Sequence, residues 1–232
     1  MTATTGGPSA AVPATRRVPW RVAAPGRTAP GSSSSVSRLA SRCLDVVLAC
    51  TLLLLLLPLL LVVVATLLET GRPVLFRQER VGRHGERFRI VKFRTMVQDA
   101  EALEERLRAR SDDPDWLLLD RDPRITRVGG VLRRLSLDEV PQLWQVVTGR
   151  MALVGPRPLS VTDAQRLPEW AHERHDVRPG LTGSWQVSGR TRLPFRQMLE
   201  LDVDYVRHRS LVRDLVLLCR TVPAVLRGSG AN

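Results

Sequence analysis

The feature that most constrains the fold is an uncharged apolar run of 23 residues, from Val46 to Leu68. A helix that enters or crosses a bilayer needs about 20 apolar residues. The run is too long, and begins too late in the chain, to be the apolar core of a secretory signal. Its uninterrupted length also argues against a helix buried in a soluble core. The sequence therefore predicts a membrane-inserted helix over residues 38–72.

Pro58 lies near the centre of this run, and proline inside a helix removes a backbone donor and clashes with the preceding turn. We therefore expect a kink, in either a transmembrane span or a re-entrant helix that returns to the same face. Arginines flank both ends, with Arg38 and Arg42 before the run and Arg72 and Arg77 after it. The positive-inside rule is compatible with both ends in the cytoplasm, and we favour the re-entrant form.

Composition divides the rest of the chain into a tail and a soluble domain. Residues 1–37 are rich in Ala, Pro, Ser, Gly and Thr, which predicts a disordered basic tail, and residues 73–232 have the composition of a soluble domain. The net charge of +12 favours an anionic partner, such as nucleic acid, membrane headgroups or a phosphorylated substrate. Aromatic residues make up only 4% of the chain, too few for stacking on bases, so we expect no nucleic-acid partner.

Periodicity predicts a mostly helical α+β domain with a short β-hairpin. Residues 73–82 and 87–96 alternate apolar and basic side chains around two glycines, as hairpin strands do. Residues 97–110 predict a charged amphipathic helix and residues 112–130 a loop. The last helix carries an apolar stripe that either faces a core or lies in the membrane interface; its residues are Leu211, Leu215, Leu218 and Val222.

An adjacent acid pair, Asp138 and Glu139, stands out in the stretch "RRLSLDEVPQLWQ". In one interpretation it belongs to a capping box, with Ser136 as the cap and Glu139 bonding back to it. In the other, a helix N-terminus beside two arginines binds phosphate and keeps Asp138 ionised. Asp138 would then be a nucleophile, and Glu139, pointing in a different direction, would hold Mg²⁺. The residues of this stretch alone leave both interpretations open.

Six stretches, in order, resemble one family: "PVLFRQERVG", "FRIVKFRTM", "DPRITRVGGVLRRLSLDEVPQLW", "MALVGPRP", "RPGLTGSWQVSGR" and "ELDVDYV". Over about residues 38–230 the chain resembles the bacterial sugar transferases, the monotopic polyprenyl-phosphate phosphoglycosyl transferases, in their short form. The resemblance implies an enzyme that transfers a sugar-1-phosphate from a UDP-sugar, such as a UDP-hexose, to undecaprenyl phosphate and releases UMP. It implies a covalent phosphosugar-aspartate intermediate, a role in initiating exopolysaccharide or glycoconjugate assembly, and a place at the cytoplasmic face of the bacterial plasma membrane.

The resemblance also implies roles for individual residues. Asp138 is implied to be the nucleophile and Glu139 the Mg²⁺ ligand, while Pro58 breaks the membrane helix. The implied phosphate- or substrate-binding residues are Arg133 at the helix start, Arg157 at the nucleotide end, Asp202 as a supporting acid, and Lys92 and Arg94 as phosphate or headgroup binders.

A different class of function competes with this one, namely a membrane-anchored basic protein that binds or assembles partners without catalysis. Its affinity for an anionic partner would fall with salt. Changing Asp138 would then leave its function intact.

Overall fold

The structure is a computed structural model that describes residues 35–69, 71, 73–108, 119, 122–188 and 193–226. Most of the predicted basic tail, residues 1–34, and much of the predicted loop at 112–130 lie outside the described residues. The described part is mostly helical with two small two-stranded sheets, which confirms the predicted α+β class.

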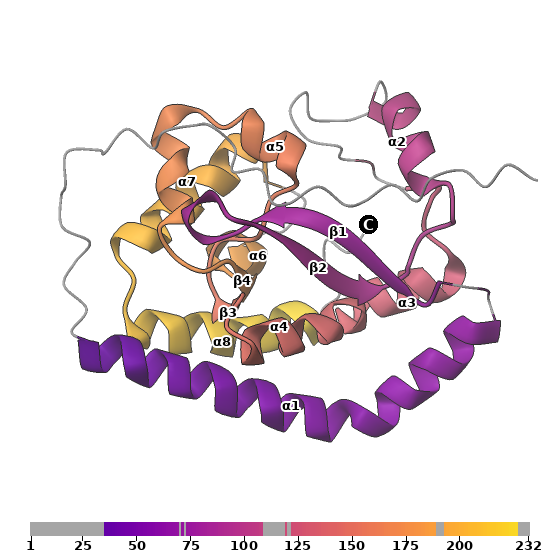
Figure 1. Ribbon diagram of the computed structural model, residues 1–232, viewed down its shortest axis with the longest axis horizontal. Coiled ribbons are helices and arrows are strands. Elements are labelled where there is room, and N and C mark those ends of the chain that lie inside the picture. Colours follow the sequence, from indigo (N-terminus) through magenta and orange to yellow (C-terminus); the bar gives the residue numbers. More distant parts are fainter. Residues whose placement is uncertain are drawn as a thin grey trace, which may run out of the picture.

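The first element is the predicted membrane helix, α1 (Ser35–Glu69), which contains Pro58. By length and composition, its segment Arg38–Leu68 could cross a membrane. Figure 1 shows α1 bending beyond its midpoint, so that both of its ends turn towards the remaining elements. A proline in this part of the helix accounts for the bend, because its ring clashes with the preceding turn.

The predicted hairpin follows, as β1 (Leu75–Val81) and β2 (Arg87–Phe93) paired antiparallel. A short 3-10 helix, Arg83–Gly85, makes the turn, and His84 and Gly85 have positive φ angles of 55° and 77°. Glycine adopts such angles without steric cost, which explains the need for Gly85. The hairpin prediction is confirmed.

The rest of the domain consists of short helices and one further strand pair. The second sheet pairs two three-residue strands in parallel. The elements are α2 (Ala100–Arg108), α3 (Arg127–Arg134), a 3-10 helix (Leu137–Gln142), α4 (Leu143–Val147), β3 (Ala152–Val154), α5 (Val161–Gln165), a 3-10 helix (Glu169–His175), β4 (Gly180–Thr182), α6 (Ser184–Ser188), α7 (Phe195–Arg207) and α8 (Leu211–Leu226).

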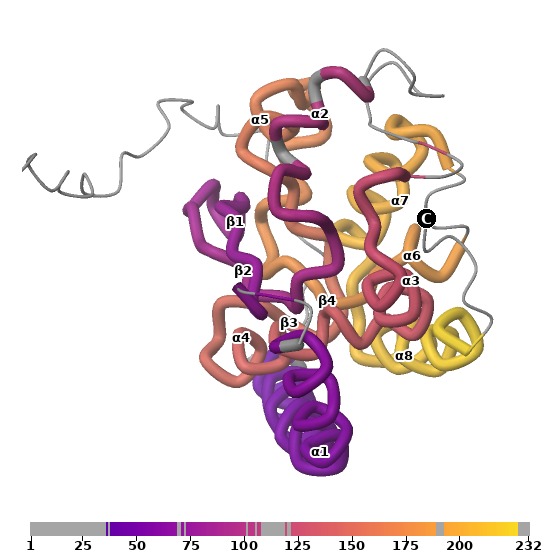
Figure 2. Tube along the Cα trace, turned by 90° about the vertical axis from the view of Figure 1, so that its right-hand side faces the viewer, coloured from indigo at the N-terminus to yellow at the C-terminus, as the bar shows by residue number. Residues whose placement is uncertain are grey.

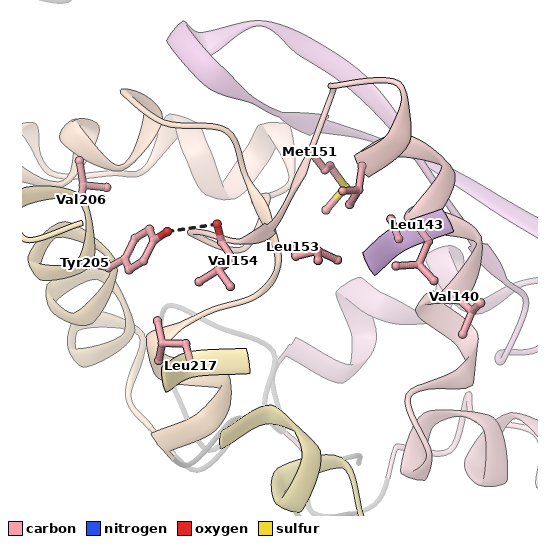
Figure 3. Packing of buried hydrophobic residues seen from close by; sticks show 10 residues of the cluster. Val140, Leu143, Met151, Leu153, Val154, Tyr205, Val206 and Leu217 are labelled. Atoms are coloured by element: carbon pink, nitrogen blue, oxygen red, sulfur yellow. Dashed lines mark hydrogen bonds between the residues drawn. The ribbon is translucent and has the colours of Figure 1, made fainter. Parts of the chain in front are cut away.

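The main core joins α1 to the domain. Ala49 of α1 is fully buried, in one cluster with Leu143 of α4, Leu153 of β3 and Leu217 of α8. Figure 3 shows part of this cluster, including Tyr205, whose hydroxyl lies 3.2 Å from the Val154 carbonyl oxygen and 2.6 Å from Asp214 Oδ1. A polar contact of this kind satisfies a hydroxyl that burial would otherwise leave unpaired.

Two polar residues near the start of α1 bind backbone groups of the domain. The Leu153 amide donates to Asp45 Oδ1 at 3.1 Å, and Arg42 Nη2 donates to the Val147 carbonyl at 2.9 Å. Each bond gives a partner to a charged group of a kind that is costly near a membrane boundary. They also hold α1 against α4 and β3, beneath the domain in Figure 2.

Half of the apolar stripe predicted in the last helix is exposed, while Leu211 and Leu218 are half-buried. Leu215 and Val222 of α8 are 43% and 60% exposed, whereas its buried positions are Asp214 and Leu217. Of the two alternatives for this stripe, the structure therefore favours an interfacial face over a core face. Figure 1 shows α8 running beside α1, on the same side of the domain.

Candidate active site

One large cavity, of about 1300 Å³, collects nearly all the predicted site residues. Typical small-ligand pockets measure roughly 300–1,000 Å³, so this one has room for a nucleotide sugar together with part of a second reactant. Its lining includes Lys92, Arg94, Arg133, Asp138, Glu139 and Arg157. Seven basic and five acidic side chains line it, and this excess of positive charge suits an anionic ligand.

The acid pair does not form the capping box that the sequence allowed. Ser136 precedes the 3-10 helix with a left-handed φ of 54°, and its side chain makes no capping hydrogen bond. Instead, the Glu139 carboxylate accepts from Arg157 Nη2 at 2.7 Å. A non-glycine residue in the left-handed region is strained, and such strain concentrates at functional sites. The turn at Ser136 brings Asp138 and Glu139 into the wall of the cavity.

Asp138 is 6% exposed on the second residue of its 3-10 helix. Burial, reinforced by the neighbouring Glu139 carboxylate, raises its pKa to about 6, while Lys92 and Arg133 oppose the rise. The helix N-terminus, which was expected to keep this carboxylate ionised, does not hold its pKa at the ordinary value, because the loss of water outweighs it. With a pKa near 6, about nine in ten Asp138 side chains are still ionised at neutral pH.

Three basic residues reach the cavity from β2 and α3. Lys92 is the penultimate residue of β2 and lies beside the Phe76 ring, with Nζ 5.2 Å from the ring centroid. Burial and then Arg133 lower the pKa of Lys92 to about 8, while Asp138 opposes this. Arg133 lies in the last turn of α3, and burial lowers its pKa as well. Arg94 follows β2 and donates to the Gly71 carbonyl at 2.6 Å, so it also ties the segment after α1 to the cavity wall.

Gln145 links the elements that carry the acid pair and the basic residues. Its side chain on α4 donates to the Arg89 carbonyl at 2.5 Å and accepts from the Val91 amide at 3.3 Å. The 3-10 helix that carries the acid pair therefore lies against β2, which carries Lys92. Because both bonds join rigid elements, they fix the position of Lys92 relative to Asp138.

Arg80 is a candidate site residue that our sequence reasoning missed. It lies on β1, lines the cavity, and has a buried Nε without a hydrogen-bond partner among the described residues. Burial and then the positive charge of Arg157 lower its pKa to about 10. A buried donor without a partner is costly and invites a ligand acceptor. The strand's alternation pointed to this position only as a basic residue of the hairpin, without a site role.

Asp202 lies outside the residues that line the cavity. It is 1% exposed on α7 and accepts from Arg174 at 2.5 Å (Nη2) and 3.2 Å (Nε). Burial raises the pKa of Asp202, and Arg174 opposes the rise. Arg174 Nη2 also donates to the Arg157 carbonyl at 2.7 Å. The structure thus connects Asp202 to the site through the backbone of Arg157, and Pro58 remains in α1 beyond the cavity lining.

The carboxylates of Asp138 and Glu139 fit a magnesium ion that is also bound by phosphate groups of a ligand. No group of three His, Cys, Asp or Glu side chains suited to a metal occurs within the described residues. Mg²⁺ keeps several waters, however, and is usually bound by one or two carboxylates together with substrate phosphates. The Asp138–Glu139 pair in a basic cavity fits that mode, in which phosphate oxygens complete the ligand set.

A cavity with an excess of basic side chains, next to a helix of membrane length, suits a membrane-associated protein that binds anionic ligands. The family model for bacterial sugar transferases matches residues 36–228. The chain therefore belongs to the bacterial sugar transferase family, as the sequence motifs implied.

Individual relatives agree with this assignment. The chain is 44% identical over 204 residues to the UDP-glucose:undecaprenyl-phosphate glucose-1-phosphate transferase of Caulobacter vibrioides, covering 83% of this chain and 72% of that protein. It is 39% identical over 207 residues to the exopolysaccharide production protein ExoY of Rhizobium meliloti (87% and 92%). It is 41% identical over 200 residues to the UDP-galactose-lipid carrier transferase of Erwinia amylovora, covering 84% of this chain but only 42% of the length of that relative.

Proposed function

We propose that this protein transfers a sugar-1-phosphate from a UDP-hexose to undecaprenyl phosphate and releases UMP, as the first step of exopolysaccharide or glycoconjugate assembly. The observation that carries the proposal is the placement of an adjacent, largely buried acid pair among basic side chains in one cavity. The names of the Caulobacter and Erwinia relatives, a UDP-glucose:undecaprenyl-phosphate glucose-1-phosphate transferase and a UDP-galactose-lipid carrier transferase, support the choice of donor and acceptor.

The reaction proceeds in two displacements at the same phosphorus. In the first, a carboxylate oxygen of Asp138 attacks the β-phosphorus of the donor, and the bond to the bridging oxygen breaks. That oxygen keeps the electron pair and leaves with UMP, so the sugar phosphate is now an acyl phosphate on Asp138. In the second, a phosphate oxygen of the acceptor attacks this phosphorus, and the bond to Asp138 breaks. The products are polyprenyl diphosphate sugar and the regenerated carboxylate.

The surrounding residues neutralise and bind the phosphate groups of the substrates. Arg133 and Lys92 neutralise the charge on the transferred phosphate, because they line the same cavity as Asp138. Arg157 binds the nucleotide end and orients Glu139 through their 2.7 Å ion pair. Arg80 offers its unpartnered Nε to a diphosphate oxygen. A bound Mg²⁺, held by Glu139, would supply further charge neutralisation at the diphosphate.

The placement in the membrane follows from α1. Its bend and the upward turn of both ends support a re-entrant helix, with the domain on one membrane face (Figure 1). Nucleotide sugars are water-soluble, so we propose the cytoplasmic face of the plasma membrane. The exposed apolar residues of α8 support contact of this helix with the same membrane surface.

The test is UMP release from a panel of UDP-sugars by the purified full chain, with undecaprenyl phosphate and Mg²⁺. We expect acceptor-stimulated release with one sugar, loss of release in the Asp138→Asn variant, and loss on chelation that Mg²⁺ restores. The Asp204→Asn variant is a matched control, because Asp204 is an exposed acid outside the cavity. Equal activity of the Asp138→Asn variant and the wild type would refute the proposal and favour a non-catalytic binding protein.

A further inference from the structure

The cavity that holds the acid pair also has a wall built from apolar residues of α1 and α8. We call this the apolar wall; it includes Leu48, Leu52 and Leu56 of α1 and Leu218, Ala224 and Val225 of α8. The α1 leucines are spaced by four residues, and Leu218 and Val225 by seven, so each helix turns one face to the cavity. Leu52 is 40% exposed and the other five are half-buried, which leaves carbon surface open to a ligand.

The apolar wall lies at the membrane side of the domain. α1 is the helix with the length and composition of a membrane segment, and α8 contacts it. The neighbouring face of α8 exposes Val212, Leu215 and Val222, which indicates that α8 lies against the same apolar phase. The wall therefore connects the charged part of the cavity to the hydrocarbon of the bilayer.

The charged and apolar parts of the cavity together indicate which kind of ligand binds there. A nucleotide sugar is polar throughout and gains nothing from a wall of leucines, valine and alanine. A lipid phosphate, by contrast, carries an anionic group and an apolar chain in one molecule, which matches the basic residues and the apolar wall together. Resting on the function proposed above, we propose that the apolar wall is the binding groove for the first isoprene units of the polyprenyl phosphate acceptor.

Such a groove determines the position of the acceptor phosphate more than the affinity for the acceptor. Membrane hydrocarbon is as apolar as leucine, so the acceptor chain gains little by moving from lipid to the apolar wall. Its contact with the two helices instead fixes where the attached phosphate ends, and misplacing a reacting group by about 1 Å can cost about 100-fold in rate. Blocking the groove should therefore slow transfer to the acceptor and leave attack on the donor unchanged.

Two tryptophan substitutions in the groove, each with a control on the same helix, test this. Leu52→Trp and Ala224→Trp narrow the apolar wall, whereas Leu54→Trp and Val222→Trp add the same bulk at positions 72% and 60% exposed that do not line the cavity. The full chain in lipid nanodiscs is assayed twice: for the burst of UMP without acceptor, and for sugar-phosphate transfer to undecaprenyl phosphate.

We expect the two groove variants to keep the UMP burst of the wild type and to lose about tenfold or more in transfer, while both controls match the wild type in both assays. Four equal transfer rates would overturn the proposal. A lost burst in the groove variants would also overturn it, because the wall would then serve donor binding or packing. If the wild type itself gave no burst, the proposed function would fail instead, so the two failures are distinguishable.

A photocrosslinking experiment identifies the occupant directly. Undecaprenyl phosphate with a diazirine near its phosphate end should label peptides that contain Leu48–Leu56 and Leu218–Val225. An equal yield on these peptides from a diazirine phospholipid would overturn the assignment to the acceptor, because the groove would then hold any membrane lipid.

Discussion

Replacing Asp202 by Asn should destabilise the protein strongly, although Asp202 does not touch the cavity. The Asp202 and Arg174 side chains are each only 2% exposed and form a 2.5 Å ion pair. The variant leaves the Arg174 guanidinium buried without an opposite charge, which typically costs about 3–5 kcal/mol. For a domain of this size, that corresponds to a fall of ~6–20 °C in melting temperature.

The control is Asp204→Asn, two residues further along α7. Asp204 pairs with Arg213 and His208, but its side chain is 50% exposed, so its loss should cost only about 0–1 kcal/mol. Melting of the detergent-purified chain, followed by tryptophan fluorescence, measures both variants. Activity should also fall in Asp202→Asn, because Arg174 holds the Arg157 carbonyl. An Asp202→Asn variant that melts like the wild type yet loses activity would refute this reasoning and return Asp202 to a direct role in substrate binding.

Three further predictions follow from the site and from α1. In the pH profile of kcat/KM for UMP release, the rate should rise as Asp138 deprotonates near its pKa of about 6 and fall as Lys92 loses its proton near its pKa of about 8. The Lys92→Arg variant should lose the decrease at high pH, and a decrease that persisted in this variant would contradict the prediction. The Arg80→Met variant should have a kcat/KM for the donor about 10- to 100-fold lower, because it loses a charge-assisted hydrogen bond to the donor. The Arg89→Met variant, changed at a 60% exposed side chain, should match the wild type. Equal kcat/KM values for the two variants would exclude a role of Arg80 in donor binding. With the three native cysteines replaced by serine, a cysteine introduced at Arg38 or at Pro73 should react with an impermeant maleimide from the same side of sealed vesicles, and labelling from opposite sides would establish a spanning helix.

Much of the fold could be predicted because it rests on local patterns. The apolar run and Pro58 predict α1 and its bend, and the alternation of residues 73–96 predicts the hairpin, because neither depends on distant contacts. The start of α3 was missed, since residues 112–130 were expected to be a loop. There Thr126 caps the helix by accepting from the Gly129 amide at 2.9 Å, and a Cβ at Gly129 would meet the Thr95 carbonyl oxygen at 2.0 Å. The close approach of Thr95 explains why residue 129 is a glycine, and the local pattern carries no signal of that tertiary contact.

The sequence predicted which residues belong to the site but not the interactions between them. The family motifs marked the acid pair and the arginines, yet the spacing of Ser136 and Glu139 equally suggested a capping box. The ion pair of Glu139 with Arg157, and the bond of Arg174 to the Arg157 carbonyl, join residues distant in the chain and have no sequence signal. Burial has no local sequence signal either, so the sequence did not predict that burial raises the pKa of Asp138. The ionised state expected at a helix N-terminus still prevails at neutral pH.

The central claim is that Asp138 becomes covalently linked to the sugar phosphate. The most direct test incubates the purified full chain with a UDP-sugar that supports UMP release, without acceptor, and measures the intact mass followed by peptide mapping. The account predicts one sugar-phosphate adduct per chain on the peptide that contains Asp138, discharged when undecaprenyl phosphate is added and absent from Asp138→Asn. An adduct on a different residue, or full transfer by the Asp138→Asn variant, would contradict it.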